Sequence, residues 1–180
     1  QAMLGWEPLG PRLIAAEFKT TKKNIKLHVI VAYAPTNDKD LEVKDAFYRQ
    51  LERVLQPIPS SDITIMMGDF NAKIGSNNRG YEEILGKHGL GDRNENGEMF
   101  VDFCATAGMV IGGSIFPHKR IHKATWTSPD LKTENQIDHI CINRRFRRSL
   151  QDVRVYRGAD VASDHHLVGG KFKLKLKKSL

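Results

Sequence analysis

Apolar and polar residues alternate along several stretches of this chain, in the period-two pattern that is typical of β-strands. Two such runs come first, at residues 12–19 and 25–34, and a short polar segment separates them. Neighbouring runs with a short polar link predict an antiparallel hairpin. The second run stops at Pro35, because proline has no amide hydrogen to donate to a strand ladder.

Two segments show instead the three-to-four-residue spacing of an amphipathic helix. The first, residues 39–56, repeats apolar residues such as Phe47 and Leu51 along one face. The second, near residues 98–107, is followed by Gly108, and glycine readily adopts the left-handed conformation that ends helices. Two helices are therefore expected between the strands.

The remaining strands are short apolar runs bounded by turn residues. Residues 63–67 form a continuous apolar run, which is typical of a central strand buried on both faces. A long Gly- and Asn-rich loop is expected over residues 72–96, and such loops are often functional. Further strands are predicted at residues 109–111, 124–127, 136–143, 152–156 and 166–177. Strands thus dominate one domain of the α+β class, packed as a sandwich rather than as a regular βαβ array.

Length and composition are those of an ordinary globular domain. The chain has 180 residues, of which 40% are hydrophobic and 27% are charged, and this length suffices for one sizeable core. No run approaches a membrane span and no cationic-then-apolar leader is present, so we expect no membrane association and a nuclear or cytoplasmic location. Cys104 and Cys141 both lie in apolar runs, which favours buried free thiols over a single disulfide.

Positive charge is concentrated towards the end of the sequence. The net charge is +7, and residues 139–180 contain eleven lysines and arginines against three acidic residues, so the remaining residues sum to about −1. A basic segment on a neutral body suits a polyanionic partner such as DNA, although a solvated surface is the simpler interpretation of charge alone. Lys171, Lys173 and Lys175 alternate with apolar residues there and are candidate phosphate contacts.

Four polar clusters stand at the ends of predicted strands, where loops can gather side chains into one site. Tyr33 ends one strand, and Gly68-Asp69-Phe70-Asn71 ends the central one. The other two clusters are Gln136-Ile137-Asp138-His139 and Ser163-Asp164-His165-His166. A half-buried strand tyrosine and a polar turn are the simpler interpretations of the first two clusters.

Asp138 is the hardest of these residues to explain as ordinary packing. It lies inside a strand that otherwise looks buried, and burying a carboxylate is costly unless it is paired. His165 and His166 are successive residues of a predicted strand and should point to opposite faces, so that one of them can face Asp138. We expect His165 to be that partner and His166 to have a structural role.

An Asp–His pair, a second aspartate and an asparagine together provide what hydrolysis of a phosphodiester requires. One group orients or deprotonates water, and others hold a divalent cation that neutralises charge on the phosphoryl oxygens. Hard oxygen ligands suit Mg²⁺ or Mn²⁺. An acyl-transfer triad fits less well, because the sequence contains no Gly-x-Ser-x-Gly elbow.

Taken in order, these clusters resemble the endonuclease/exonuclease/phosphatase superfamily, and most of all the apurinic-type endonuclease domains of RTE-like non-LTR retrotransposons and their domesticated relatives. Four further segments share the resemblance, namely Gly5-Trp6-Glu7-Pro8, Arg12-Leu13-Ile14-Ala15, Thr125-Trp126-Thr127-Ser128-Pro129-Asp130 and Val155-Tyr156-Arg157-Gly158-Ala159-Asp160-Val161. The resemblance implies a DNase I-like fold, in which two mainly antiparallel sheets and flanking helices form a four-layer α/β/β/α sandwich with the site at one edge.

The resemblance also implies roles around the scissile phosphate. Tyr33 would contact that phosphate, and Asp69 would position or activate the attacking water. Asn71 would hold the phosphate or the same water. Trp126 lies where relatives shape the nucleotide pocket.

Two further roles concern the metal ion and the general base. By resemblance, Asp164 would be a ligand of Mg²⁺ or Mn²⁺. His165 would act on the phosphate or as a base, and Asp138 would orient it.

One departure from the family pattern affects the metal site. Two strands that precede Gly5 in the family carry an asparagine and a Gln-Glu pair, whose glutamate is a principal metal ligand. No residue before Tyr33 can take this part, so we expect residues 1–180 to be an N-terminally truncated domain that lacks its first strands and has an incomplete metal site. Exposed strand edges invite pairing with another chain, and we expect a homodimer or a strand-swapped assembly to cover the gap.

The leading hypothesis is therefore a Mg²⁺- or Mn²⁺-dependent endonuclease domain that nicks DNA, weak or inactive in this truncated form. An alternative from another class is a catalytically silent nucleic-acid-binding or protein-interaction module that retains the fold. A third is a phosphatase of the same superfamily that acts on phosphoinositides or lipids. The basic segment and the retrotransposon-like motifs favour nucleic acid over lipid.

Overall fold

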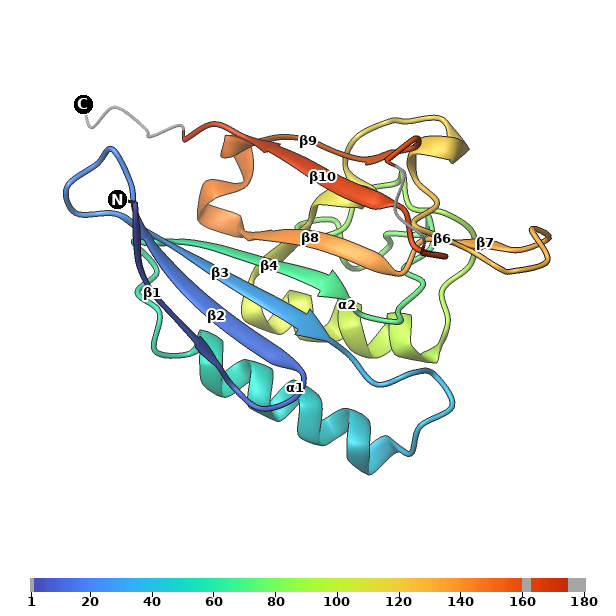
Figure 1. The fold of residues 1–180 in the computed structure, drawn as a ribbon, viewed down its shortest axis with the longest axis horizontal. Helices are drawn as coiled ribbons and strands as arrows, with labels where there is room; N and C mark the ends of the chain where they lie inside the picture. The colour runs from blue at the N-terminus through green and yellow to red at the C-terminus, as the bar shows by residue number, and fades with distance from the viewer. Residues whose placement is uncertain (1, 160–162, 175–180) are drawn as a thin grey trace.

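A six-stranded sheet is the largest element of the computed structural model, which describes residues 2–159 and 163–174 (Figure 1). In spatial order its strands are β1 (Met3–Pro8), β2 (Leu13–Lys19), β3 (Lys26–Tyr33), β4 (Ile63–Asp69), β8 (Asp138–Asn143) and β5 (Met109–Ile111). Neighbouring strands are antiparallel except β3 and β4, which run parallel. The predicted hairpin of β2 and β3 is confirmed, and so is the central place of the apolar run in β4.

Two helices cover one face of this sheet (Figure 1). The first, α1 (Leu41–Leu55), connects the parallel strands β3 and β4, as a parallel crossover requires. The second, α2 (Glu95–Ala107), ends at Gly108, whose φ of 66° is left-handed. Apolar side chains of both helices, among them Phe47 and Phe100, form a buried cluster with the sheet.

A smaller layer packs on the opposite face of the sheet. It consists, in the part of the chain that the structure describes, of β9 (Leu150–Tyr156) and β10 (Leu167–Phe172), which pair antiparallel. Ile140, Ile142 and Val153 belong to a second buried cluster between this layer and the sheet. The fold is therefore a mainly antiparallel α+β sandwich, as the sequence predicts.

Short elements complete the chain. They are the hairpin strands β6 (Trp126–Thr127) and β7 (Glu134–Asn135) and the 3₁₀ helices η1 (Gly112–Ser114), η2 (Arg120–His122) and η3 (Arg144–Ser149). Cys104 and Cys141 are buried free thiols, and burial raises the pKa of the Cys104 thiol well above its usual range. No helix among the described residues is long and apolar enough to cross a membrane.

The two-stranded layer leaves part of the six-stranded sheet uncovered. Ile14 and Val31 lie opposite each other on one face and are 45% and 39% exposed, and Trp6 on the edge strand is 65% exposed. Among the described strands, β1 pairs only with β2 and β10 pairs only with β9. The exposed edges that the sequence leads us to expect are therefore present.

Three of the differences from the sequence-based prediction have a clear physical reason or limit. The strand pattern does not predict β1, because glycine and proline at its centre and end are poor strand formers. Helix α2 begins at Glu95 rather than near residue 98, since the Asn94 side chain accepts a hydrogen bond from the Gly97 amide and caps the helix. The last strand, predicted over residues 166–177, ends at Phe172, and residues 175–177 lie outside the described part of the chain.

Gly68 allows β3 and β4 to approach each other just before the site. Its φ is 141°, and a Cβ atom there would lie 1.9 Å from the carbonyl oxygen of Ala32. Only glycine fits such a conformation and such a contact without a shift of the backbone.

We predict that Gly68→Ala lowers the free energy of unfolding by about 2–4 kcal/mol, because it adds a backbone clash to an unfavourable φ. Gly80→Ala is the matched control, since Gly80 also has a positive φ of 83° but no heavy atom within 4 Å of its Cβ position. Its cost should be about 1 kcal/mol. Urea denaturation measures both values, and equal losses would contradict the close approach at Gly68.

Candidate active site

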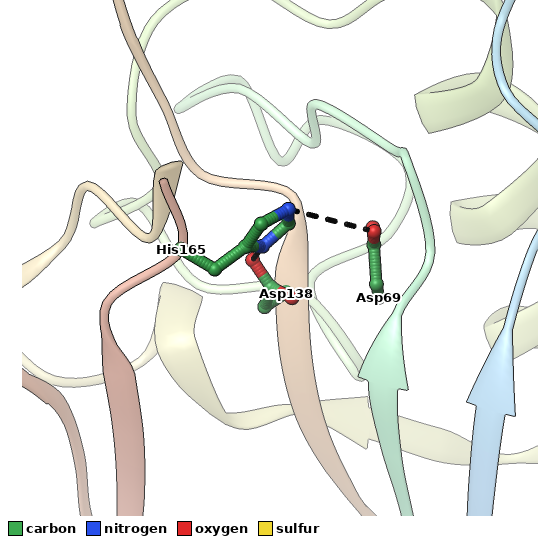
Figure 2. Close-up of side chains that lie close together, drawn as sticks. All are labelled: Asp69, Asp138 and His165. Atoms are coloured by element: carbon green, nitrogen blue, oxygen red, sulfur yellow. Dashed lines mark hydrogen bonds and ion pairs between the residues drawn. The ribbon is translucent and has the colours of Figure 1, made fainter. Parts of the chain in front are cut away.

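Three strand ends meet at one edge of the six-stranded sheet. In the register of the sheet, Tyr33 at the end of β3 lies beside Asp69 at the end of β4, and Asp69 lies opposite Asp138 at the start of β8. His165 reaches the same edge from the segment that precedes β10 (Figure 2). The fold thereby brings together polar residues from four separate parts of the sequence.

His165 lies between two carboxylates (Figure 2). Its Nδ1 is 2.9 Å from Oδ2 of Asp138, and its Nε2 is 3.9 Å from Oδ2 of Asp69. One potential ligand atom from each of the three residues lies within 4.8 Å of the others. The predicted pairing of Asp138 with His165 is confirmed, and His166 instead places its Nε2 2.8 Å from the Thr127 hydroxyl.

Burial and mutual charge shift the protonation of this group. Burial raises the pKa of Asp69, and the nearby charge of Asp138 raises it further, although the Asn71 amide that donates to Asp69 opposes the shift. For His165, burial by itself lowers the pKa, but the charge and hydrogen bond of Asp138 and the charges of Asp69 and Asp164 together outweigh it, so that the pKa is raised. Groups whose pKa values move towards neutrality are suited to proton transfer at physiological pH.

Asn71 shapes the turn that follows β4. Its backbone amide donates to Oδ1 of Asp69 over 2.9 Å, and its side-chain Nδ2 donates to the Ala34 carbonyl over 2.9 Å. Its φ is 48°, a left-handed conformation that asparagine tolerates better than most residues. Asn96, which is buried, donates from Nδ2 to the carbonyls of Pro35 and Asn71. Asn71 and Asn96 together join the ends of β3 and β4.

Thr125 holds the start of β8 in place. Its buried hydroxyl accepts hydrogen bonds from the amides of Ile137 and Asp138, over 3.0 and 3.1 Å. Neither Thr125 nor Asn96 was predicted as a site residue, because each is a single polar residue whose partners are distant in sequence. The one available signal was the position of Thr125 in a segment that matches the family.

Tyr33 stands exposed at the same edge with an arginine beside it. The side chain of Tyr33 is half exposed. The guanidinium carbon of Arg12 lies 5.3 Å from the centre of the Tyr33 ring, and its Nη1 donates to the Tyr33 carbonyl over 3.2 Å. An arginine in this position adds a positive charge where a phosphate is expected.

Asp164 and Trp126 form a neighbouring pair. The indole Nε1 of Trp126 donates to Oδ2 of Asp164 over 2.7 Å, and this bond lowers the pKa of Asp164. The two segments are joined further by an isolated bridge between Trp126 and His165. Asp164 does not belong to the group of three potential ligands described above, and its role as a metal ligand stays a prediction.

The lysines that were predicted to contact phosphate lie away from this edge. β10 begins two residues after His165 and ends at Phe172, which pairs with Leu150 at the far end of β9 (Figure 1). Lys171 and Lys173 are exposed at that far end. Lys175 lies outside the described residues. Any phosphate bound by Lys171 or Lys173 would therefore be separated from the group of Asp69, Asp138 and His165.

Solved structures show which class of proteins has this fold. The endonuclease domain of TRAS1, a telomere-specific non-LTR retrotransposon, is similar with a TM-score of 0.63 and 16% identity, over 92% of this chain and 65% of that chain. The 3′ phosphatase NExo from Neisseria, bound to product DNA hairpin, gives a TM-score of 0.66 and 18% identity, over 95% of this chain and 71% of that chain. The chain therefore has the DNase I-like fold of endonuclease/exonuclease/phosphatase proteins.

In sequence, the chain is similar to Craniofacial development protein 2. It is 38% identical over 178 residues to this protein from Tragulus javanicus and equally to that from Bos taurus. The alignment covers 98% of this chain but only 30% and 29% of those proteins, so the chain spans less than a third of the curated relatives it matches. The resemblance found in the sequence is confirmed. No family model matches the chain, and the comparisons do not support the expected homodimer.

We predict that Asp138→Asn lowers the pKa of His165, because it removes the largest of the charges that raise that pKa. Titration of the imidazole ring protons by NMR measures this shift. Asp152→Asn is the control, since Oδ1 of Asp152 lies 2.6 Å from Nε2 of a different histidine, His118. It should leave the pKa of His165 unchanged. A His165 pKa that does not respond to Asp138→Asn would show that the pair is not coupled in solution.

The same coupling has a consequence for stability. The pKa of His165 is raised in the folded state above its unfolded value of about 6.5. The pair of protonated His165 and Asp138 therefore stabilises the fold fully at a pH below that unfolded value. This contribution is lost as the pH rises through the raised pKa. Asp138→Asn should therefore cost more stability at about pH 5.5 than at about pH 9.

Proposed function

We propose that this chain carries the catalytic residues of a divalent-metal-dependent phosphodiesterase that acts on DNA. We call the sheet edge that holds Asp69, Asp138 and His165 the catalytic edge. The observation that carries the proposal is the convergence of Asp69, Asp138 and His165 within 4.8 Å at one sheet edge. The nuclease-type fold of TRAS1 and NExo supports it. A DNA substrate would be met in the nucleus, which we propose as the location.

In the proposed reaction, the residues at the edge divide the work of hydrolysis. Asp69 positions or deprotonates the attacking water, for which its raised pKa is suited. His165, held by Asp138, acts on a phosphoryl oxygen or as a base. Tyr33 contacts the scissile phosphate, and Asn71 keeps the turn that presents Asp69.

Mg²⁺ or Mn²⁺ fits the chemistry of this edge. The carboxylates of Asp69 and Asp138 are close enough to share a cation, and hard oxygen donors are what these ions prefer. Asp164, on the adjoining segment, is the further protein ligand that the resemblance implies. When bound, the ion would neutralise negative charge on the phosphoryl oxygens. Following the family resemblance, we propose that a glutamate outside this chain completes the ligand set.

We predict that Asp69→Asn lowers the rate of plasmid nicking in Mg²⁺ by about 10²–10⁴-fold, the usual contribution of general acid–base groups, when it is made in a version of this chain extended by strands that carry the proposed glutamate. Asp45→Asn is the control, because it makes the same chemical change on the exposed surface of α1. Nicking that survives Asp69→Asn would refute the proposed role. Salt-dependent DNA binding without nicking in Mg²⁺ or Mn²⁺ would favour a catalytically silent binding module instead.

The proposed glutamate yields a separate prediction. We expect the 180-residue chain to nick plasmid much more slowly than the extended version at equal Mg²⁺, because a missing carboxylate removes charge that holds the metal. Titration of both proteins with Mn²⁺ measures the difference in metal affinity directly. Equal rates and equal affinities would show that this chain already contains the full ligand set.

A further inference from the structure

Positive side chains gather at the end of the molecule opposite the catalytic edge. The 3₁₀ helix η3 exposes its arginines while Phe146 and Ser149 beneath them are buried. Further exposed cations come from the turn between β2 and β3 and from the end of β10. We call this group the basic end, and it consists of Lys22, Lys23, Arg147, Arg148, Lys171 and Lys173.

Hydrogen bonding and packing between the three segments hold the basic end together. The amide of Lys173 donates to the Ser149 carbonyl over 2.8 Å, which joins the end of β10 to η3. Ile25, in the turn between β2 and β3, packs against the same buried cluster as Phe172 and Phe146. The three segments that carry the cations therefore border one apolar cluster and lie at one end of the sandwich (Figure 1).

Carboxylates near the basic end are already engaged elsewhere. Glu17 pairs with Lys26 over 2.8 Å, Asp152 lies 2.6 Å from His118, and Glu83 pairs with Arg144. In the described part of the chain, none of the six basic-end side chains forms an ion pair with a carboxylate. Like charges held together in this way attract a polyanion and raise its rate of association.

The catalytic edge has the opposite charge. Asp69, Asp138 and Asp164 concentrate negative charge there, which draws a cation but repels a nucleic-acid backbone. β3 runs from one end to the other, and its seven steps from Lys26 to Tyr33 span about 23 Å. That length corresponds to about seven base pairs of duplex DNA, at about 3.4 Å each. The cations that could attract DNA therefore lie far from the carboxylates of the catalytic edge.

We propose that the basic end is a second nucleic-acid-binding surface, which holds phosphates of the DNA backbone at a distance from the scissile bond. The proposal rests on DNA as the substrate of the catalytic edge. The proposed interactions are electrostatic and independent of base sequence, because contacts of lysine and arginine with phosphates carry no sequence information. The basic end thus sets affinity and salt dependence, and it leaves the chemical step unchanged.

The test removes charge from the basic end in a quadruple variant, Arg147→Gln/Arg148→Gln/Lys171→Gln/Lys173→Gln. Fluorescence anisotropy without divalent metal measures its affinity for a duplex of about 24 base pairs, long enough to span both ends of the protein, at several salt concentrations. We expect at least about a tenfold loss of affinity, and a salt dependence whose slope weakens by about 0.9 for each phosphate that the variant no longer neutralises. Nicking at saturating DNA should be unchanged.

A second variant with the same change in net charge is the matched control. It is Arg49→Gln/Arg53→Gln/Arg79→Gln/Lys87→Gln, which changes exposed cations outside the basic end. An unchanged thermal unfolding midpoint shows that each variant is folded. Equal losses of affinity in both variants, or no loss in either, would overturn the proposal. Equal displacement of the duplex by poly-glutamate would also overturn it, since phosphate would then not be the recognised group.

Separate measurements of DNA binding and of nicking distinguish a failure of the basic end from a failure of the proposed catalytic role. A protein that never nicks DNA but loses affinity in the basic-end variant alone supports the basic end and refutes the catalytic proposal. If the protein nicks DNA, and the wild type and both variants bind DNA with the same affinity, the catalytic proposal is supported and the basic end is refuted.

Discussion

The site depends on the register of β4 against β8. This register sets Asp69 opposite Asp138, and because side chains alternate between the two faces of a sheet, a slip of one residue would turn one carboxylate away from the other. Met67 opposite Ile140 stands on the same face two residues earlier, and both pack in the cluster beneath the second layer. Burial of these apolar side chains therefore fixes the positions of the carboxylates, and the hydrogen bond to Asp138 places His165.

Negative and positive charge gather at opposite ends of the sheet. The strand ends at the catalytic edge hold carboxylates so close together that burial and repulsion raise the pKa of Asp69, while the six cations of the basic end have no carboxylate partners among the described residues. The apolar clusters between them supply the rigidity that keeps the two ends apart. The proposed function uses both features of this arrangement: carboxylates that could hold a cation at one end, and cations without carboxylate partners that could meet a polyanion at the other.

Much of the fold could be predicted from local pattern. Alternation and helical spacing locate β2, β3, α1 and α2 to within a few residues, because each of these elements buries one face of its own sequence. A continuous apolar run locates the central strand β4. β1 was not predicted because glycine and proline interrupt its short run and because its residues, all of them exposed, show no apolar pattern. Thr125 and Asn96 were not predicted for another reason: each is a single polar residue that becomes important only when distant backbone groups lie beside it.

The sequence by itself determined which chemical groups are available and which strands carry them. Tyr33, Asp69, Asp138 and His165 are recognisable because polar residues at the ends of apolar strands conflict with simple burial. Only the tertiary structure decided which of these groups meet and at what distance, since β4 and β8 are separated by a long loop and a helix, and their register depends on packing across the whole sheet. The tertiary structure also placed Lys171 and Lys173 away from the site. Their alternation predicts an exposed face, but the direction in which β10 runs decides which end of the molecule that face occupies.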